Sequence, residues 1–216
     1  MTQLFNPRLA LTALPEILKG LPMSLALLVI CFLLGNLFAG ILMYLRQSHH
    51  RGLVILVNTY ISFFRSVPAL VVLFIAYFGF NLKALPAGIS SLSLIAGAFL
   101  AEYYRTALLG IDPSQIEAAQ ALGMTRQMIF YRIIFPQAFR ILLPALGNVL
   151  IDMFKSTSLV AMITVSEMFM QAKIVAGANQ DYMTIYLVLA GIYWVVCSIL
   201  SSGQHRLEVY FAKQHA

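Results

Sequence analysis

Five long apolar stretches, joined by shorter polar links, dominate the pattern of this chain. They cover residues 21–45, 53–80, 90–109, 141–170 and 183–200. Each is close to the roughly 20 residues with which an α-helix crosses the hydrocarbon of a bilayer. Lipid cannot hydrogen-bond to the backbone, so each stretch is predicted to be a helix. We therefore expect an all-α, polytopic transmembrane helix bundle of about five spans, formed by residues 1–216 as a single domain.

The composition is typical of a protein whose surface is surrounded by lipid. Of the 216 residues, 61% are hydrophobic and 10% are charged, whereas soluble proteins carry about 25% charged residues. Five spans leave no room for a soluble catalytic domain, so we expect a protein that is not an enzyme. Cys31 and Cys197 lie within apolar stretches and the four His residues lie in links or the tail. The sequence therefore predicts no disulfide, no metal and no cofactor.

The distribution of Lys and Arg predicts the orientation in the membrane. With five spans, eight of these residues share the side of the C-terminus: Arg46, Arg51, Arg105, Arg126, Arg132, Arg140, Arg206 and Lys213. Four lie on the opposite side: Arg8, Lys19, Lys83 and Lys173. Positively charged links stay in the cytoplasm, so we expect the N-terminus outside and the C-terminus inside. Because these charges are spread over many links, they do not indicate a nucleic acid partner.

A hydrophilic segment over about 111–140 interrupts the apolar pattern on the predicted cytoplasmic side. Its first helix begins either at an Asp112 cap followed by Pro113 or at a capping box formed by Ser114 and Glu117, and it runs to Leu122. Gly123 suits the left-handed position that ends helices. Thr125 is predicted to cap a second helix, which runs to about Phe135, where Pro136 ends or kinks it. The segment is thus expected to form a helix, a glycine turn and a second helix.

Six residues of this segment have a spacing that resembles the signature loop of binding-protein-dependent ABC importer permeases. They are Glu117, Ala118, Ala119, Gly123, Ile133 and Pro136. Phe135 departs from the pattern, because the family has Leu there. A lone Glu117 would be explained as an acid at a helix N-terminus, but the joint spacing favours the resemblance. It implies that these six residues dock a separate ATPase subunit.

The resemblance extends over nearly the whole chain and points to permeases for polar amino acids of the histidine, glutamine and glutamate type. The matching elements are residues 20–25, 65–74, 101–105 and 155–159, with departures at Ser24, Ser66, Val67 and Ser156. It implies the type I ABC importer permease fold, in a bacterial cytoplasmic (inner) membrane. It also implies three kinds of partner: ABC ATPase subunits, a second permease subunit in a homo- or heterodimer, and an extracytoplasmic amino-acid-binding protein. The chain itself contains no phosphate-binding Gly-x-x-x-x-Gly-Lys-Ser/Thr loop.

Several charged residues fall within or near the predicted spans. Such groups are costly in lipid and face protein or water. The candidates for a polar substrate pathway are Arg65, Glu102, Arg105 and Lys155. A second interpretation is that Glu102 pairs only with Arg105, and Asp152 only with Lys155, each three residues apart on one helix face.

Two other functions remain open from the sequence. One is an ion-coupled secondary transporter, although such proteins often contain inverted repeats that this chain lacks. The other is a membrane anchor or assembly subunit without a pathway.

Overall fold

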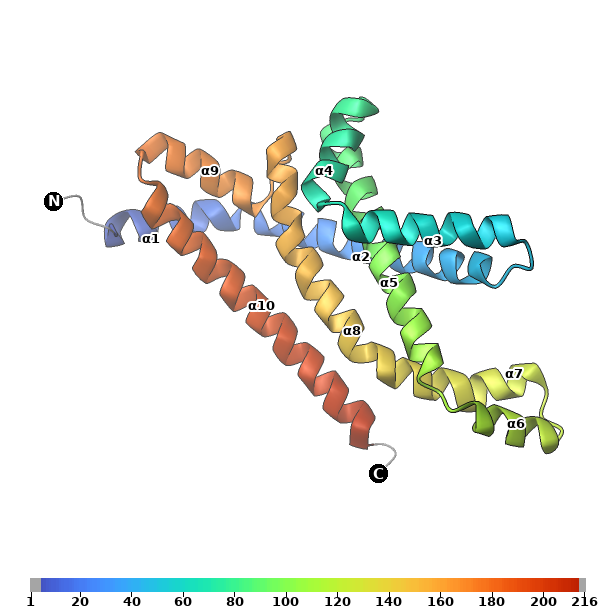
Figure 1. The fold of residues 1–216 in the computed structure, drawn as a ribbon. Coiled ribbons are helices and arrows are strands. Elements are labelled where there is room, and N and C mark those ends of the chain that lie inside the picture. The colour runs from blue at the N-terminus through green and yellow to red at the C-terminus, as the bar shows by residue number, and fades with distance from the viewer. Residues whose placement is uncertain (1–4, 214–216) are drawn as a thin grey trace.

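The computed structural model describes residues 5–213, whose regular elements are all helices (Figure 1). In chain order they are α1 (Pro7–Leu18), α2 (Leu21–Arg46), α3 (Arg51–Ser66), α4 (Ala69–Phe74), the π-helix η1 (Ile75–Gly79), α5 (Ala84–Leu109), α6 (Pro113–Ala121), α7 (Arg126–Ile129), the π-helix η2 (Phe130–Ile134), α8 (Phe135–Ser156), the 3₁₀-helix η3 (Thr157–Ile163), α9 (Met168–Asn179) and α10 (Tyr182–Lys213). α1 and α9 lie at one end of the molecule, and α6 and α7 lie at the other.

Four helices in the described range are long and apolar enough to cross a membrane: Leu21–Arg46, Ala84–Leu109, Arg126–Ile163 and Tyr182–Phe211. The second apolar stretch forms a bent pair of helices, since α3 and the α4–η1 helix meet at an angle of 108°; counted as one, the pair is a fifth candidate span. Pro68 causes the break: it disfavours a helical conformation at the preceding residue, and Val67 is extended, with ψ at 132°. The expected all-helical bundle is confirmed, and the four long helices with the bent pair agree with the prediction of about five spans.

Three predicted boundaries are wrong. The second helix of the hydrophilic segment does not end near Phe135, since α7, η2 and α8 follow one another without a break up to Ser156. The π-helical turn η2 widens the backbone just before Pro136, which lets the helix accept a residue that lacks an N–H. The apolar stretch 141–170 is divided between α8, η3 and α9. The polar link that follows it is largely helical, in α9, and the tail after residue 200 continues α10 as far as Lys213.

Small residues allow the central helices α2 and α5 to approach closely. A Cβ atom on Gly35 would lie 2.7 Å from the Cβ of Ala96, and one on Gly97 would lie 2.8 Å from the Cβ of Phe38. Helices in lipid associate through such close packing rather than through a hydrophobic driving force. By contrast, α10 exposes Trp194, with 74% of its surface accessible. This face of α10 is apolar and suits contact with lipid.

Candidate functional site

The hydrophilic segment forms a compact elbow, defined here as Pro113–Ile134, which comprises α6, α7 and η2. Asp112 caps α6: its Oδ1 atom accepts a hydrogen bond from the Ser114 N–H at 2.9 Å. Of the two predicted starts, the structure therefore has the Asp112 cap with Pro113 at the first helical position. The Ser114 N–H holds the pKa of the Asp112 carboxyl below its usual value, since it stabilises the ionised form.

The turn of the elbow depends on Gly123, whose φ is +76°. The Gly123 N–H donates to the Gln120 carbonyl at 2.9 Å, and the Met124 N–H donates to the Ala119 carbonyl at 3.1 Å. This pair of bonds is the Schellman motif, which ends a helix with a left-handed residue. Thr125 then caps α7, where its hydroxyl accepts the Met128 N–H at 3.3 Å. The predicted helix, glycine turn and helix start are confirmed.

The elbow, whose second half is the start of the candidate span Arg126–Ile163, exposes several large apolar side chains. Leu122 is 83% exposed and Tyr131 is 69% exposed, and Phe130 and Met128 are exposed as well. The Phe130 and Tyr131 rings lie 5.3 Å apart, and exposed apolar side chains that adjoin one another are typical of a site that another molecule covers. The Gln137 side-chain amide donates a hydrogen bond of 2.6 Å to the Gln115 Oε1 atom, which ties α6 to the first turn of α8.

Five of the six residues of the spacing motif lie in the elbow, and Pro136 lies just beyond it, in α8. Glu117, Ala118 and Gly123 are exposed, whereas Ala119 is buried, and Ile133 and Pro136 are half-buried. The first three thus lie on the surface of the elbow, while Ala119 and Ile133 contribute to its interior. The spacing motif does not include Leu122, the most exposed large apolar residue of the region. At that position the sequence predicted only the end of the first helix.

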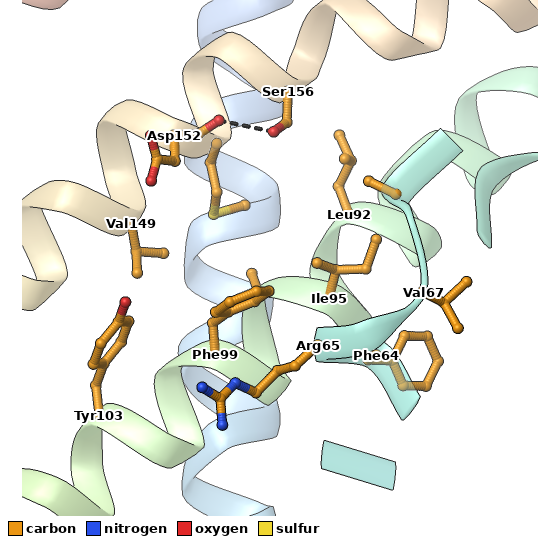
Figure 2. Close-up of a pocket in the computed structure, with 13 residues that line it drawn as sticks. Phe64, Arg65, Val67, Leu92, Ile95, Phe99, Tyr103, Val149, Asp152 and Ser156 are labelled. Carbon is orange, nitrogen blue, oxygen red and sulfur yellow. Dashed lines mark hydrogen bonds between the residues drawn. The ribbon is translucent and has the colours of Figure 1, made fainter. Parts of the chain in front are cut away.

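A cavity of about 310 Å³ lies among α3, α5 and α8 (Figure 2). Its charged lining residues are Arg65, from the end of α3, and Asp152, from α8. Tyr103 and Ser156 add hydroxyl groups, and the rest of the wall is apolar or aromatic. One positive and one negative group in an apolar cavity form a site suited to a small polar ligand.

The Arg65 guanidinium lies over the ring of Phe99, with its Cζ atom 5.6 Å from the ring centroid. This cation–π contact orients the guanidinium. Within residues 5–213, Arg65 has no carboxylate within ion-pair distance. Its charge therefore remains available to a ligand in the cavity.

Asp152 pairs with Lys155 at 2.7 Å, as predicted from their spacing. The Asp152 side chain is nevertheless 71% exposed and that of Lys155 is 56% exposed. Lys155 does not line the cavity itself. The sequence grouped Asp152 only with Lys155, because nothing in the linear pattern shows that α3 ends beside α8.

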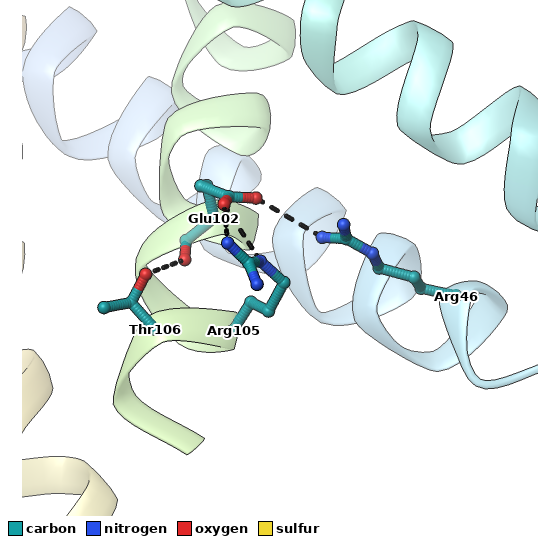
Figure 3. A network of polar contacts seen from close by, with 4 residues as sticks. All are labelled: Arg46, Glu102, Arg105 and Thr106. Atoms are coloured by element: carbon teal, nitrogen blue, oxygen red, sulfur yellow. Dashed lines mark hydrogen bonds and ion pairs between the residues drawn. The ribbon is translucent and has the colours of Figure 1, made fainter. Parts of the chain in front are cut away.

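Glu102 and Arg105 form a second charged cluster (Figure 3), and neither residue lines the cavity. Glu102 pairs with Arg105 on α5, as predicted, and also with Arg46 at the end of α2, at 3.3 Å. The Arg46 contact was not foreseen, since the two residues are 56 positions apart. The cluster ties α2 to α5 at this level of the bundle.

The family described as "binding-protein-dependent transport system inner membrane component" matches residues 35–209. The chain is similar to a probable amino-acid ABC transporter permease, YckA, of Bacillus subtilis, with 40% identity over 97% of this chain and 95% of the relative. It is also similar to the L-cystine transport system permease TcyB of Bacillus subtilis, with 36% identity over 92% of this chain and 89% of the relative.

Solved structures agree with these sequence relationships. A chain of an amino acid ABC transporter, described as crystallised with histidines, superposes with a TM-score of 0.85 and 33% identity, covering 91% of this chain and 94% of that chain. A chain of an inward-facing MetNI methionine ABC transporter superposes with a TM-score of 0.75 over 91% of this chain and 96% of that chain. Its identity is 21%, so it supports the fold alone.

Proposed function

Because this chain belongs to the family of binding-protein-dependent transport system inner membrane components, we propose that its elbow docks an ATPase and that its cavity lies on an amino acid pathway. The chain is the permease subunit of an ABC importer for amino acids, and ATP is hydrolysed by a separate subunit. Its family operates with a binding protein as well as with the ATPase. Its substrate is a polar amino acid, and a second permease subunit completes the pathway.

The exposed apolar surface of the elbow is the observation that supports docking. Leu122, next to the glycine turn, and Tyr131, in η2, are both left open by the rest of the chain. The Schellman turn and the caps at both helix starts make this surface rigid. A rigid contact transmits movement, so closure of the ATPase subunits on ATP would pull on α8 through η2.

The orientation follows from the same arrangement. The elbow and α9 lie at opposite ends of the molecule, and ATP is available only in the cytoplasm. We therefore place the elbow and the C-terminus inside and the N-terminus outside, in a bacterial inner membrane, in agreement with the distribution of Lys and Arg. The binding protein then approaches the end formed by α1 and α9.

The exposed charges on α8 indicate where the second permease lies. Asp152 and Lys155 are both exposed in the isolated chain, yet lipid is a poor surrounding for charge. Their face is therefore covered by water or by the second subunit, and the cavity beside it opens on the pathway. Arg65 faces that pathway, while Glu102 and Arg105 join Arg46 in fastening α2 to α5.

Uptake into proteoliposomes tests this function. The chain, reconstituted with its ATPase and binding protein, should accumulate labelled amino acid only when ATP is present. Uptake by the chain alone, driven by an ion gradient, would instead support a secondary transporter. Normal uptake after neutral replacement of Arg65 and Lys155 together would support an anchor subunit without a pathway.

A further inference from the structure

We propose that Gln204 of α10 is a positioning residue that links ATP hydrolysis to movement of α8. Its side-chain amide holds α8 at a flexible part of that helix, residues 144–148, which we call the hinge segment. The contact stabilises the arrangement seen in this structure, and it breaks when the docked ATPase moves the elbow. This inference rests on the proposed function, because it concerns how movement of the elbow passes into the spans.

The hinge segment is a weak part of the interior of α8. Pro144 lies inside the helix and has no N–H to donate to the carbonyl four residues earlier. Gly147 follows within the same turn, and glycine weakens a helix interior because it loses more conformational freedom on folding than other residues. Sharp bends in helices are most often found at proline. We therefore expect α8 to bend at residues 144–148.

Gln204 attaches the hinge segment to α10. Its Nε2 atom donates a hydrogen bond of 3.1 Å to the Pro144 carbonyl and lies 3.5 Å from the Oδ1 atom of Asn148. The same atom donates at 2.8 Å to the carboxylate of Glu208, one turn further along α10, which orients the amide. Hydrogen bonds between helices in lipid are modest and shift an equilibrium about three- to thirtyfold. A contact of this strength favours one arrangement without preventing the other.

Gly147 makes room for this amide. A Cβ atom at residue 147 would overlap the end of the Gln204 side chain, to which its three nearest atoms all belong. Because the end of a glutamine side chain is flexible, Gly147→Ala would displace the amide rather than the helix. Substitutions at residues 147 and 204 thus remove the same contact in two chemically different ways.

A cavity of about 410 Å³ lies beside the contact, between α2, α8 and α10. Gly147 and Gln204 line it together with apolar side chains that include Phe32, Leu146 and Leu150. Protein interiors are otherwise close-packed. This space therefore allows α8 to shift at the hinge segment without overlapping its neighbours.

The hinge segment lies between the elbow and the part of α8 that reaches the cavity among α3, α5 and α8. α7, η2 and α8 run without a break from the elbow to Ser156, and residues 144–148 come before Asp152, which lines that cavity. Movement of the elbow therefore reaches the hinge segment first. The Gln204 contact resists this movement while it is intact. Its loss should make the ATP-bound arrangement more populated in the absence of the binding protein.

The rate of basal ATP hydrolysis tests the proposal, measured with the permease–ATPase complex in proteoliposomes without the binding protein. Gln204→Leu removes the amide at similar volume, and Gly147→Ala displaces it. Each should raise the basal rate about threefold or more, as the strength of one hydrogen bond between helices implies. General damage to the fold would instead lower the rate. The double variant should be no faster than the faster single variant, since both changes remove one contact.

Gly191→Ala is the matched control, because it adds the same methyl group at an open position of α10, and its basal rate should stay within about twofold of that of the unchanged complex. An unchanged or lower rate for either single variant, in a complex that assembles and unfolds at the temperature of the unchanged complex, would overturn the proposal. So would rate increases that multiply in the double variant. If Gln204→Leu fails to assemble, Gly147→Ala decides by itself. Absence of ATP-driven uptake by the unchanged complex would count against the proposed function instead.

Discussion

The Ser24 hydroxyl donates a hydrogen bond of 3.2 Å to the Glu167 carboxylate across 143 positions of the chain. Glu167 is buried and also caps α9, accepting the N–H groups of Phe169 and Met170 at 2.9 and 2.8 Å. Gly20 makes this contact possible, because a Cβ there would lie 2.5 Å from the Glu167 backbone. The start of α2 is thereby joined to the start of α9.

Glu167→Ala should destabilise the protein more than Ser24→Ala does. The glutamate change leaves two backbone N–H groups without their acceptor, at about 1–3 kcal/mol for each buried group left unpaired. Loss of the serine hydroxyl removes one bond to the carboxylate and leaves one backbone N–H, that of Met168 at 3.2 Å, without its acceptor. Thermal unfolding of the solubilised subunit measures both, with Ser201→Ala, at an exposed position of α10, as the control. Equal unfolding temperatures for Glu167→Ala and the unchanged protein would show that the Glu167 cap of α9 does not stabilise the fold.

Gly123→Val should weaken attachment of the ATPase while leaving the spans intact. A β-branched residue at a φ of +76° is strained by roughly 1–2 kcal/mol, so docking should weaken about tenfold or the turn should move. Co-purification of the ATPase and coupled ATP hydrolysis are the measurements. Gly52→Val is the control, since the space around Gly52 is open and its φ is not positive. A Gly123→Val complex that assembles and transports normally would show that the turn is dispensable.

Gly35→Leu should disrupt the crossing of α2 and α5. The added side chain would meet the Cβ of Ala96, and overpacking of this kind costs typically 1–3 kcal/mol. Gly40 lies on the same helix with open space around it, so Gly40→Leu should be tolerated. The unfolding temperature and the size-exclusion profile should be measured for both variants and compared with those of the unchanged protein. Similar behaviour of the two would mean that close packing at Gly35 contributes little.

Glu102→Gln should lower stability with little effect on substrate affinity. Glu102 contacts Arg46 and Arg105 and does not line the cavity. Ion pairs at a protein surface contribute about 0.2–1 kcal/mol each, and these two are part-buried, so the melting temperature should fall by a few degrees. The KM of uptake should stay within about twofold. A large rise in KM would instead place Glu102 on the pathway, as one hypothesis from the sequence holds.

The cap of α6 should weaken in acid. The pKa of Asp112 is lowered in the folded protein, so the cap contributes in full above the ordinary aspartate value, about 3.9. That contribution is lost as pH falls through the lower folded-state pKa. Amide hydrogen exchange of the first turn of α6, corrected for intrinsic rates, should rise in that range. Asp112→Asn retains a cap that does not titrate, and its protection should change less with pH.

Local chemistry made the elbow predictable. Asp112, Pro113, Gly123 and Thr125 act on their immediate neighbours, so residue identity alone indicated a cap, a helix start, a left-handed turn and a second cap. Pro136 was misjudged for the opposite reason. Its effect depends on whether the preceding turn widens, and the π-helix η2 is a property of the folded backbone rather than of one residue.

Hydrophobicity by itself determined the helical spans and the polar segment between them, because the requirement to satisfy the backbone in lipid acts on each segment separately. Tertiary structure alone decided that Arg65 and Asp152 share a cavity, that Glu102 meets Arg46, and that Ser24 reaches Glu167. These pairs come from helices distant in the chain, so they form only when small residues such as Gly20 and Gly35 let the backbones approach. The pairing of side chains across a bundle is set by that packing, which no local pattern encodes.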